Sequence, residues 1–221
     1  SPQAAAISQI VVQDTQLALE RLGHSWRSQF AIPVIGVAGS NGKTTTKEMT
    51  ATILAQAGSC LATRGTLNNH IGVPLTLLRI EATNQFAVIE MGANHPAEIA
   101  RLAAIAKPDI GIVTMAGDAH LEGFGSREGV AHGKGELFAA LDGGVAVINA
   151  DDAFAPLWRD LAKRASILTF GCAEAADVRA ERVQIAADET HFRLVTPDGH
   201  AEVTLRLAGR HNVSNALAAA A

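Results

Sequence analysis

Residues 33–46 read Pro33-Val34-Ile35-Gly36-Val37-Ala38-Gly39-Ser40-Asn41-Gly42-Lys43-Thr44-Thr45-Thr46. An apolar run typical of a buried strand is followed by a glycine-rich turn and then by Lys-Thr, where a helix begins. A helix N-terminus has unpaired N–H groups and a positive dipole end, and glycines let the backbone curl so that these groups face one anion. Lys43 would reach the outer phosphates of a nucleotide, and the Thr44 hydroxyl would bind Mg²⁺. The stretch therefore predicts a nucleotide phosphate site.

One position departs from the common form of this motif. In G-x-x-x-x-G-K-[ST] the first glycine falls at position 37, where this chain has Val37. The glycine that is present, Gly39, lies closer to the lysine. A glycine-rich β-turn with a surface lysine is the alternative interpretation. The strand before the loop and the helix after it favour phosphate binding.

Composition limits the class of protein. The chain has 221 residues, of which 48% are hydrophobic, enough for one large α/β domain or two small ones. A net charge of -4, with 4% aromatic residues and no tyrosine, argues against a nucleic-acid partner. Two cysteines, Cys60 and Cys172, fit a reducing compartment. With neither an apolar run of bilayer length nor a signal-peptide pattern, we expect a cytoplasmic protein without membrane insertion.

The rest of the chain alternates between apolar runs and helical patterns. Continuous apolar runs predict buried parallel strands at 34–38, 86–91, 109–115, 145–149 and 166–170. Beyond Gly171, residues 201–207 alternate with period two and would pair with 191–195 across a turn, with a third strand near 183–185. The predicted fold class is α/β: a P-loop NTPase-like, mostly parallel sheet flanked by helices, with a small antiparallel β-sheet near the C-terminal end.

Two helices carry specific expectations. Asp14 is a suitable N-cap for a helix that runs to about Leu22 and is stopped by Gly23. The helix after the glycine-rich loop is expected to span 43–57. Its inward face is predicted to consist of Met49, Ile53, Leu54 and Ala57.

Several polar residues are candidates for chemistry. Glu90 ends a buried strand, at the edge where open α/β sheets bind ligands, so it is either a Mg²⁺ ligand or a hydrogen-bonded structural acid. His120 follows the next strand, although loop histidines are more often structural and Mg²⁺ prefers oxygen. Lys134 lies within a helix, and its spacing does not distinguish it from a solvated lysine. Four polar loop residues would either form hydrogen bonds with a substrate or form turns: Asn68, Asn69, Asn94 and His95.

Residues 38–45 resemble the phosphate loop of the Mur ligases, the ATP-dependent amide-forming enzymes of peptidoglycan synthesis. Four further segments are similar to one type of Mur ligase, which joins D-Ala-D-Ala to UDP-N-acetylmuramoyl-tripeptide. These segments are Thr66-Leu67-Asn68-Asn69-His70-Ile71-Gly72-Val73-Pro74, Val88-Ile89-Glu90-Met91-Gly92-Ala93-Asn94-His95, Ala119-His120-Leu121-Glu122-Gly123-Phe124-Gly125 and Gly209-Arg210-His211-Asn212-Val213-Ser214-Asn215-Ala216. The resemblance implies a lead-in segment and helix at residues 1–30 and the central ATP-binding domain at 31–221. The N-terminal uridine-nucleotide domain and the C-terminal domain of the family would lie outside this chain.

The resemblance also implies roles for individual residues. In this family the defining glycine of the loop matches Gly39, which accounts for Val37. The ATP-binding positions would be Gly39, Ser40, Asn41, Gly42, Lys43, Thr44, Thr45, Asn212 and Asn215. Two Mg²⁺ ions would be held by Thr44, Glu90, His120 and a CO₂-derived carbamate on Lys134. The muramoyl-peptide substrate would lie near Asn68, Asn69, Asn94 and His95. The catalytic group would comprise Lys43, Glu90, His120 and Lys134.

The implied reaction is phosphoryl transfer from ATP to the terminal carboxylate of the peptide, followed by attack of the D-Ala-D-Ala amine on the acyl phosphate. The implied partners are small molecules, and a monomer is expected. Two alternatives stay open: another Mur-type or folylpolyglutamate-type ligase, and a nucleotide-binding module without ligase activity. With its flanking domains absent, the chain alone is not expected to catalyse ligation.

Overall fold

The computed structural model describes residues 8–221, so the first seven residues of the predicted lead-in segment lie outside the described part of the chain. The strands are β1 (Val34–Ala38), β2 (Cys60–Ala62), β3 (Phe86–Glu90), β4 (Ile110–Val113), β5 (Val145–Asn149), β6 (Ser166–Gly171), β7 (Val178–Ile185), β8 (Thr190–Thr196) and β9 (Gly199–Leu205). The helices are α1 (Thr15–Arg27), α2 (Lys43–Leu54), α3 (Gly72–Leu77), α4 (Glu98–Ala106), α5 (Leu121–Phe124), α6 (Arg127–Ala139), α7 (Ala155–Leu161) and α8 (Arg210–Ala220).

The nine strands form one sheet in the order β2-β3-β1-β4-β5-β6-β7-β8-β9. Strands β1 to β6 pair in parallel, and β7 is parallel to β6 but antiparallel to β8. The predicted antiparallel strands are therefore confirmed, and they continue the parallel sheet through the pairing of β6 with β7. The α/β fold class is confirmed with them.

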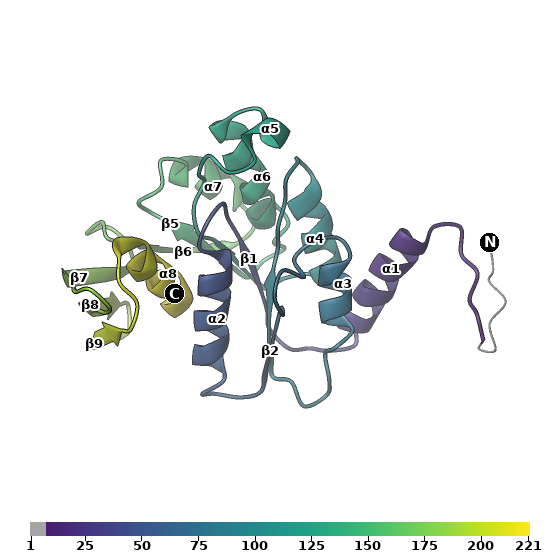
Figure 1. The fold of residues 1–221 in the computed structure, drawn as a ribbon, viewed down its shortest axis with the longest axis horizontal. Helices are drawn as coiled ribbons and strands as arrows, with labels where there is room; N and C mark the ends of the chain where they lie inside the picture. The colour runs from purple at the N-terminus through teal and green to yellow at the C-terminus, as the bar shows by residue number, and fades with distance from the viewer. Residues whose placement is uncertain (1–7) are drawn as a thin grey trace.

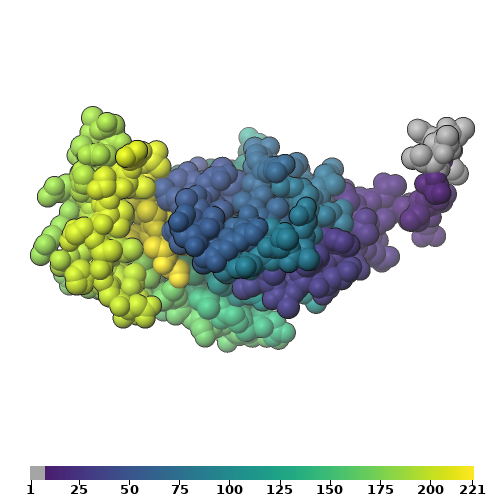
Figure 2. Space-filling model, turned by 90° about the horizontal axis from the view of Figure 1, so that it is seen from below, coloured from purple at the N-terminus to yellow at the C-terminus, as the bar shows by residue number. Residues whose placement is uncertain are grey.

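Both faces of the parallel part are covered by helices, as the continuous apolar runs predicted (Figure 1). Val34 and Ala38 of β1 belong to one hydrophobic core, whereas Ile35 and Val37 belong to the other. Helices α2 and α8 cover the second core, while α4, α6 and α7 cover the first. In Figure 2 the C-terminal strands and α1 lie at opposite ends of the molecule. Within residues 8–221, no helix is long and apolar enough to cross a membrane.

The first helix differs from its prediction at its C-terminal end. Asp14 is the N-cap, and its side chain accepts a 2.9 Å hydrogen bond from the backbone of Leu17, as expected. The helix nevertheless continues through Gly23 to Arg27. A Cβ at position 23 would lie 2.9 Å from the Cα of Pro74. Gly23 therefore permits close packing of α1 on α3 and does not end the helix.

The predicted inward face of α2 was wrong for Ile53, whereas Leu54 does pack against a hydrophobic core. The helix ends at Leu54, and Ile53 is 50% exposed. Its buried residues are Thr46, Lys47 and Thr50. Tertiary contacts override the apolar pattern here because this face packs against α8 and β3 and carries polar groups toward the ends of the strands. The buried Lys47 is the main consequence and is considered again below.

Candidate nucleotide and substrate site

The glycine-rich loop lies where the order of the sheet reverses. Strands β2 and β3 lie on one side of β1 in the sheet, and β4 and β5 lie on the other side. The chain therefore leaves β1 and β4 in opposite directions, and a crevice forms between the loops that follow these two strands. Ligands of open α/β sheets bind in such crevices. Three hydrogen bonds tie the two loops together: Ser40 N to Met115 O at 2.9 Å, Gly117 N to Ser40 Oγ at 2.9 Å and Thr114 Oγ1 to Asn41 O at 2.6 Å.

Two glycines of the loop are required by its backbone. Gly39 has φ +140° and Gly42, the N-cap of α2, has φ +81°. A side chain at these positions would collide with Thr114 and Asn215, respectively. Position 37 has no such requirement, because Val37 is fully buried inside β1 and pairs with β3. This geometry explains why valine replaces the first glycine of the common motif.

Lys43 folds back over the loop that precedes it. Its Nζ donates hydrogen bonds to the carbonyl oxygens of Gly39 at 2.8 Å and Ser40 at 3.2 Å. Burial lowers the pKa of Lys43, and the nearby Glu90 carboxylate partly opposes this effect. Phosphate oxygens form stronger, charge-assisted hydrogen bonds with an ammonium than neutral carbonyls do. Lys43 is thus positioned to exchange its hydrogen bonds with the loop carbonyls for hydrogen bonds with a bound anion.

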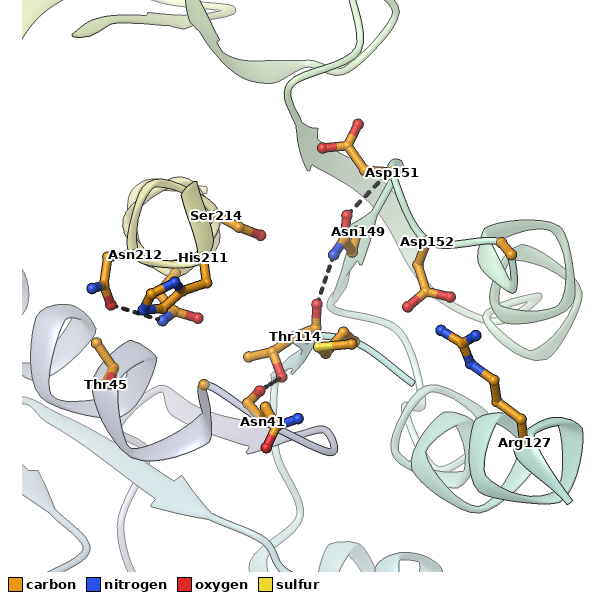
Figure 3. Close-up of a pocket in the computed structure, with 14 residues that line it drawn as sticks. Asn41, Thr45, Thr114, Arg127, Asn149, Asp151, Asp152, His211, Asn212 and Ser214 are labelled. Atoms are coloured by element: carbon orange, nitrogen blue, oxygen red, sulfur yellow. Dashed lines mark hydrogen bonds between the residues drawn. The ribbon is translucent and has the colours of Figure 1, made fainter. Parts of the chain in front are cut away.

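A cavity of about 730 Å³ lies on one side of the loop (Figure 3). The structure brings several predicted nucleotide-binding residues to it, from segments far apart in the sequence. They are Asn41, Gly42, Thr45, Asn212 and Asn215. Asn215, on α8, accepts a 3.4 Å hydrogen bond from Thr46 Oγ1 on α2 and so joins the two helices beside the cavity.

Other residues of this cavity were not predicted from the sequence. Asn149 donates a 2.7 Å hydrogen bond to Thr114 O, and Asp152 accepts one of 2.9 Å from Ala116 N, so both support the loop after β4. Arg127 on α6 also lines the cavity. The position of Asn149 and Asp152 at the carboxyl end of a predicted strand was an available signal. For Arg127 no comparable local signal exists.

A second cavity, of about 460 Å³, lies on the other side of Lys43. It unites residues predicted from four separate segments: Lys43, Asn68, Asn69, Asn94 and His120. Glu98, Arg101 and His70, to which no role was assigned, also line it. His95 lies outside this lining, with a 65% exposed side chain whose Nδ1 is 3.4 Å from Glu98.

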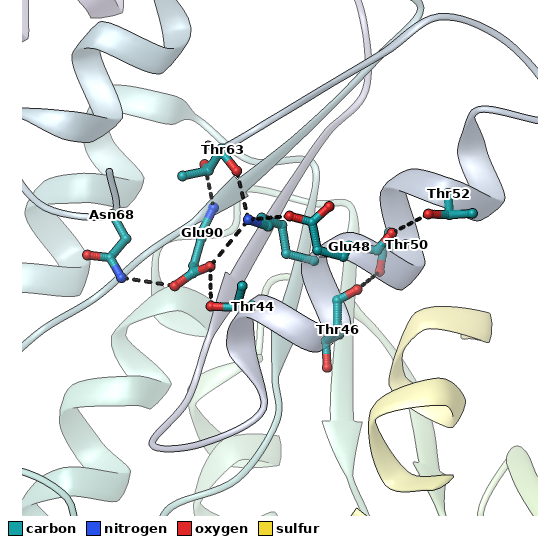
Figure 4. Close-up of polar contacts among 9 residues, drawn as sticks. Thr44, Thr46, Glu48, Thr50, Thr52, Thr63, Asn68 and Glu90 are labelled. Atoms are coloured by element: carbon teal, nitrogen blue, oxygen red, sulfur yellow. Dashed lines mark hydrogen bonds and ion pairs between the residues drawn. The ribbon is translucent and has the colours of Figure 1, made fainter. Parts of the chain in front are cut away.

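Glu90, the last residue of β3, lies between Thr44 of α2 and Asn68, and it is only 2% exposed (Figure 4). Its Oε2 accepts a 3.0 Å hydrogen bond from Thr44 Oγ1, and its Oε1 accepts one of 2.9 Å from Asn68 Nδ2. The Thr44 proton therefore points at Glu90, which leaves the lone pairs of that hydroxyl free to bind a cation. The hydrogen bonds fit both interpretations of this acid, structural and metal-binding.

Lys134 is buried, with 1% exposure, so it is not the solvated lysine that remained possible from sequence. Its Nζ donates a 2.8 Å hydrogen bond to Ala93 O and lies 4.9 Å from the centre of the Phe124 ring. Burial and the positive charge of Lys43 lower the pKa of Lys134 to about 8. Burial also lowers the pKa of the exposed His120, and Lys134 and Lys43 act in the same direction.

The donors are not arranged as a closed metal cage. In the described part of the chain, no three or more His, Cys, Asp or Glu side chains are grouped so that they could hold a metal ion. The Thr44 hydroxyl is instead bonded to the single Glu90 carboxylate, His120 lines the smaller cavity, and Lys134 bonds to Ala93 of that cavity. Mg²⁺ commonly uses one or two carboxylates together with water and substrate phosphates, so this set of donors fits Mg²⁺ better than zinc.

A parallel sheet with a glycine-rich loop at its switch point, followed by a helix that begins with Lys-Thr, defines the class of P-loop α/β domains. Comparison with known families identifies the chain further. Residues 37–221 match the family described as the Mur ligase middle domain, and the chain belongs to this family.

Individual relatives agree with this assignment. The chain is 45% identical over 217 residues to the UDP-N-acetylmuramoyl-tripeptide–D-alanyl-D-alanine ligase of Escherichia coli, covering 97% of this chain and 48% of that protein. A crystal structure of MurF from Acinetobacter baumannii superposes with a TM-score of 0.95 at 42% identity, over 100% of this chain and 49% of that one. MurF ligase from Thermotoga maritima in complex with ADP gives a TM-score of 0.83 at 27% identity, over 99% and 51%. The chain thus spans about half the length of these relatives.

Proposed function

We propose that this chain is the ATP-binding part of a ligase that adds D-alanyl-D-alanine to UDP-N-acetylmuramoyl-tripeptide. Residues 31–221 would form the central ATP-binding domain, and residues 1–30 the lead-in from a preceding domain. The names of the relatives and the ADP complex of the Thermotoga maritima structure support this proposal. In this proposal the enzyme is a monomer that acts on small molecules in the cytoplasm.

The position of Lys43 is the observation that carries the proposal. Its loop neighbours Asn41, Gly42 and Thr45 line the larger cavity, whereas Lys43 itself lines the smaller one. A nucleotide in the larger cavity would place its terminal phosphate on the loop, next to whatever occupies the smaller cavity. This arrangement suits phosphoryl transfer between two bound molecules, because the transferred group need not leave the cation that stabilises it.

Phosphoryl transfer solves the chemical difficulty of making an amide from a carboxylate. A carboxylate oxygen of the peptide attacks the γ-phosphorus of ATP, the bond to the β–γ bridging oxygen breaks, and ADP leaves. The D-alanyl-D-alanine amine then attacks the acyl carbon, phosphate leaves with its oxygen, and the amine loses a proton. Several anionic groups approach one another in the first step, so cations and backbone N–H groups must offset their repulsion.

In this proposal Thr44, Glu90, His120 and a carbamate on Lys134 hold two Mg²⁺ ions, which would neutralise phosphate charge. Carbamylation requires a neutral amine, and the lowered pKa of Lys134 supports its availability near neutral pH. Addition of CO₂ converts this amine into an anionic oxygen donor and releases one proton. Lys134 is buried beside Ala93, which lines the smaller cavity, so the carbamate oxygens would lie toward the metal site.

The smaller cavity would receive the muramoyl-peptide. Asn68, Asn69 and Asn94 provide amide donors and acceptors there, and His95 would act from outside the cavity lining. The position of Asn69 is fixed locally, because its side chain accepts hydrogen bonds from the backbone N–H groups of Ile71 and Gly72. Asn68 Nδ2 likewise donates to Glu90, so substrate contacts would fall to Asn94 and to the remaining amide groups of Asn68 and Asn69.

Calorimetric titration of the chain with a non-hydrolysable ATP analogue and Mg²⁺ tests the proposal. Binding is expected for the parent chain and for Lys163→Ala, which removes an exposed lysine outside both cavities, but not for Lys43→Ala. Equal binding by Lys43→Ala would contradict the role of the loop. In the complete enzyme, phosphate release should require the peptide carboxylate, and release without it would favour a nucleotide-binding module that is not a ligase.

A further inference from the structure

Helix α2 contains a second lysine, Lys47, one turn after Lys43, and its side chain is fully buried at 0% exposure. Lysine is almost never fully buried unless its charge is paired. Its Nζ donates a 2.7 Å hydrogen bond to Thr63 O and lies 2.9 Å from Glu48 Oε1 and 3.8 Å from Glu90 Oε2. The proposed reaction does not use this lysine, so its burial needs an explanation.

Thr63 connects this lysine to Glu90 by a second route. The Thr63 hydroxyl accepts a 3.0 Å hydrogen bond from the backbone N–H of Glu90, while the Thr63 carbonyl accepts from Lys47. Both the main chain and the carboxylate of Glu90 are therefore joined to Lys47, directly or through one residue. Figure 4 shows Thr63 and Glu90 side by side, with Thr44 and Asn68 on the other side of the carboxylate.

The charge of Lys47 is largely balanced before Glu90 is considered. Glu48 is its nearer carboxylate partner, at 2.9 Å against 3.8 Å for Glu90. Because opposite charges at short range offset each other, the Lys47–Glu48 pair exerts a weaker field on a nearby cation than Lys47 alone would. The main effect of Lys47 on Glu90 is thus geometric.

We propose that Lys47 is a positioning residue that holds the Glu90 carboxylate facing Thr44, and that it thereby sets the Mg²⁺ affinity of the nucleotide site. This inference rests on the proposed function, in which Thr44 and Glu90 serve the metal. Lys47 does not contact nucleotide or metal. It fixes Thr63, and with it the carboxyl end of β3, against α2. Groups that orient metal ligands in this way commonly change metal affinity about 10- to 100-fold when they are removed.

The test compares the ADP affinity of the chain with and without Mg²⁺ by calorimetry, so that the ratio of the two affinities reports the metal alone. Lys47→Met keeps the length of the side chain but removes the ammonium, and the ratio is expected to fall about 10- to 100-fold while Mg²⁺-free ADP binding is retained. Lys47→Arg keeps the charge with a different geometry, so it should fold and show a smaller decrease in the same direction.

Glu48→Gln is the matched control, because it removes the 63% exposed partner but leaves the hydrogen bond of Lys47 to Thr63. The ratio should fall less than in Lys47→Met, because only the charge balance of Lys47 is lost while its hydrogen bond to Thr63 is retained. Hydrogen exchange of the Glu90 amide provides a readout independent of the metal, and it should accelerate in both Lys47 variants.

The results distinguish a failure of the Lys47 inference from a failure of the proposed nucleotide site. A parent chain that binds ADP with a Mg²⁺ enhancement, beside Lys47 variants that keep the same enhancement and the same Glu90 amide exchange, would overturn this inference alone. An enhancement that grows in Lys47→Met would also overturn it, because the lysine would then act by charge repulsion. A parent chain that fails to bind ADP, or binds it without regard to Mg²⁺, would overturn the proposed site and this inference together.

Discussion

The hydroxyl of Thr44, in the first turn of α2, donates a 3.0 Å hydrogen bond to Oε2 of Glu90, the last residue of β3. This bond joins the phosphate loop to the neighbouring strand and fixes which way the threonine lone pairs face. The two residues are 46 positions apart in the sequence.

Thr44→Val should abolish the Mg²⁺ enhancement of nucleotide binding, because it replaces the hydroxyl by a methyl group of similar size. The free energy of unfolding should fall by about 1–3 kcal/mol, since a buried carboxylate loses one donor. Calorimetry and denaturant unfolding measure the two effects. Thr52→Val is the control: its hydroxyl bonds Glu48 O within the exposed part of α2, so nucleotide binding should not change. An unaltered enhancement in Thr44→Val would remove Thr44 from the metal site.

Gly42→Ala should prevent nucleotide binding. The residue has φ +81°, and an alanine Cβ would collide with Asn215. Gly143→Ala is a close match because Gly143 has φ +86° but open space around its Cβ position. Both variants should lose about 1–2 kcal/mol of stability from the left-handed backbone. Only Gly42→Ala should lose affinity for the ATP analogue, and comparable losses in both would mean that strain alone is responsible.

In the complete enzyme, Lys134→Ala should lose ligase activity and regain part of it when short carboxylates such as formate or acetate are added. The added anion would supply the oxygen donors that a carbamate on Lys134 provides. Initial rates of phosphate release with increasing carboxylate measure this rescue, with chloride at equal ionic strength as the control. Full activity in the unrescued variant would eliminate the carbamate role.

The lowered pKa of Lys134 predicts a pH dependence of stability. Its pKa is about 8 in the folded chain against 10.5 for the ordinary group, so the unfolded chain binds more protons between these values. Stability attributable to this residue therefore rises as pH increases from about 8 to about 10.5. Burial raises the pKa of Cys60 to about 11 and acts in the opposite direction at high pH. The difference in unfolding free energy between the parent and Lys134→Met isolates the lysine, and a pH-independent difference would contradict the lowered pKa.

Glu136→Ala should destabilise the N-terminus of α4, although Glu136 itself lies on α6. The Glu136 carboxylate, on α6, accepts hydrogen bonds from Ala97 N at 2.6 Å and Ala100 N at 3.0 Å, where α4 begins. Loss of such a cap commonly lowers stability by about 0.5–2 kcal/mol. Denaturant unfolding would measure the loss, with the exposed Glu174→Ala as the control. Equal stability of the two variants would show that α4 does not depend on Glu136.

Much of the fold was predictable from local patterns. Continuous apolar runs identified the parallel strands, because a strand buried on both faces has no polar side to display. Asp14 was predicted to begin a helix, and its side chain accepts a 2.9 Å hydrogen bond from Leu17 N at the start of α1. The loop motif located Gly39 to Thr44, since the spacing of glycine, lysine and threonine is a local property of the backbone.

Contacts between distant segments were not predictable in this way. Gly23 was expected to end a helix and instead packs on Pro74, and Ile53 was expected to face inward and is half exposed. Spacing alone did not distinguish Lys134 from a solvated helix lysine, and no prediction was made for Lys47, yet both are buried. Arg127 reaches the larger cavity only because α6 packs beside the loops after β4 and β5.

The alternation of strands and helices and the glycine-rich loop follow from local sequence, because they depend on periodicity and on backbone conformations that only glycine adopts readily. The burial of particular charges and the sharing of a cavity by distant loops depend on tertiary contacts. Burial and cavity formation depend on the order of strands in the sheet, which places Lys43 between two cavities and brings Thr44, Lys47 and Asn68 to Glu90. That order is set by the packing of the whole chain and is not encoded in any single segment.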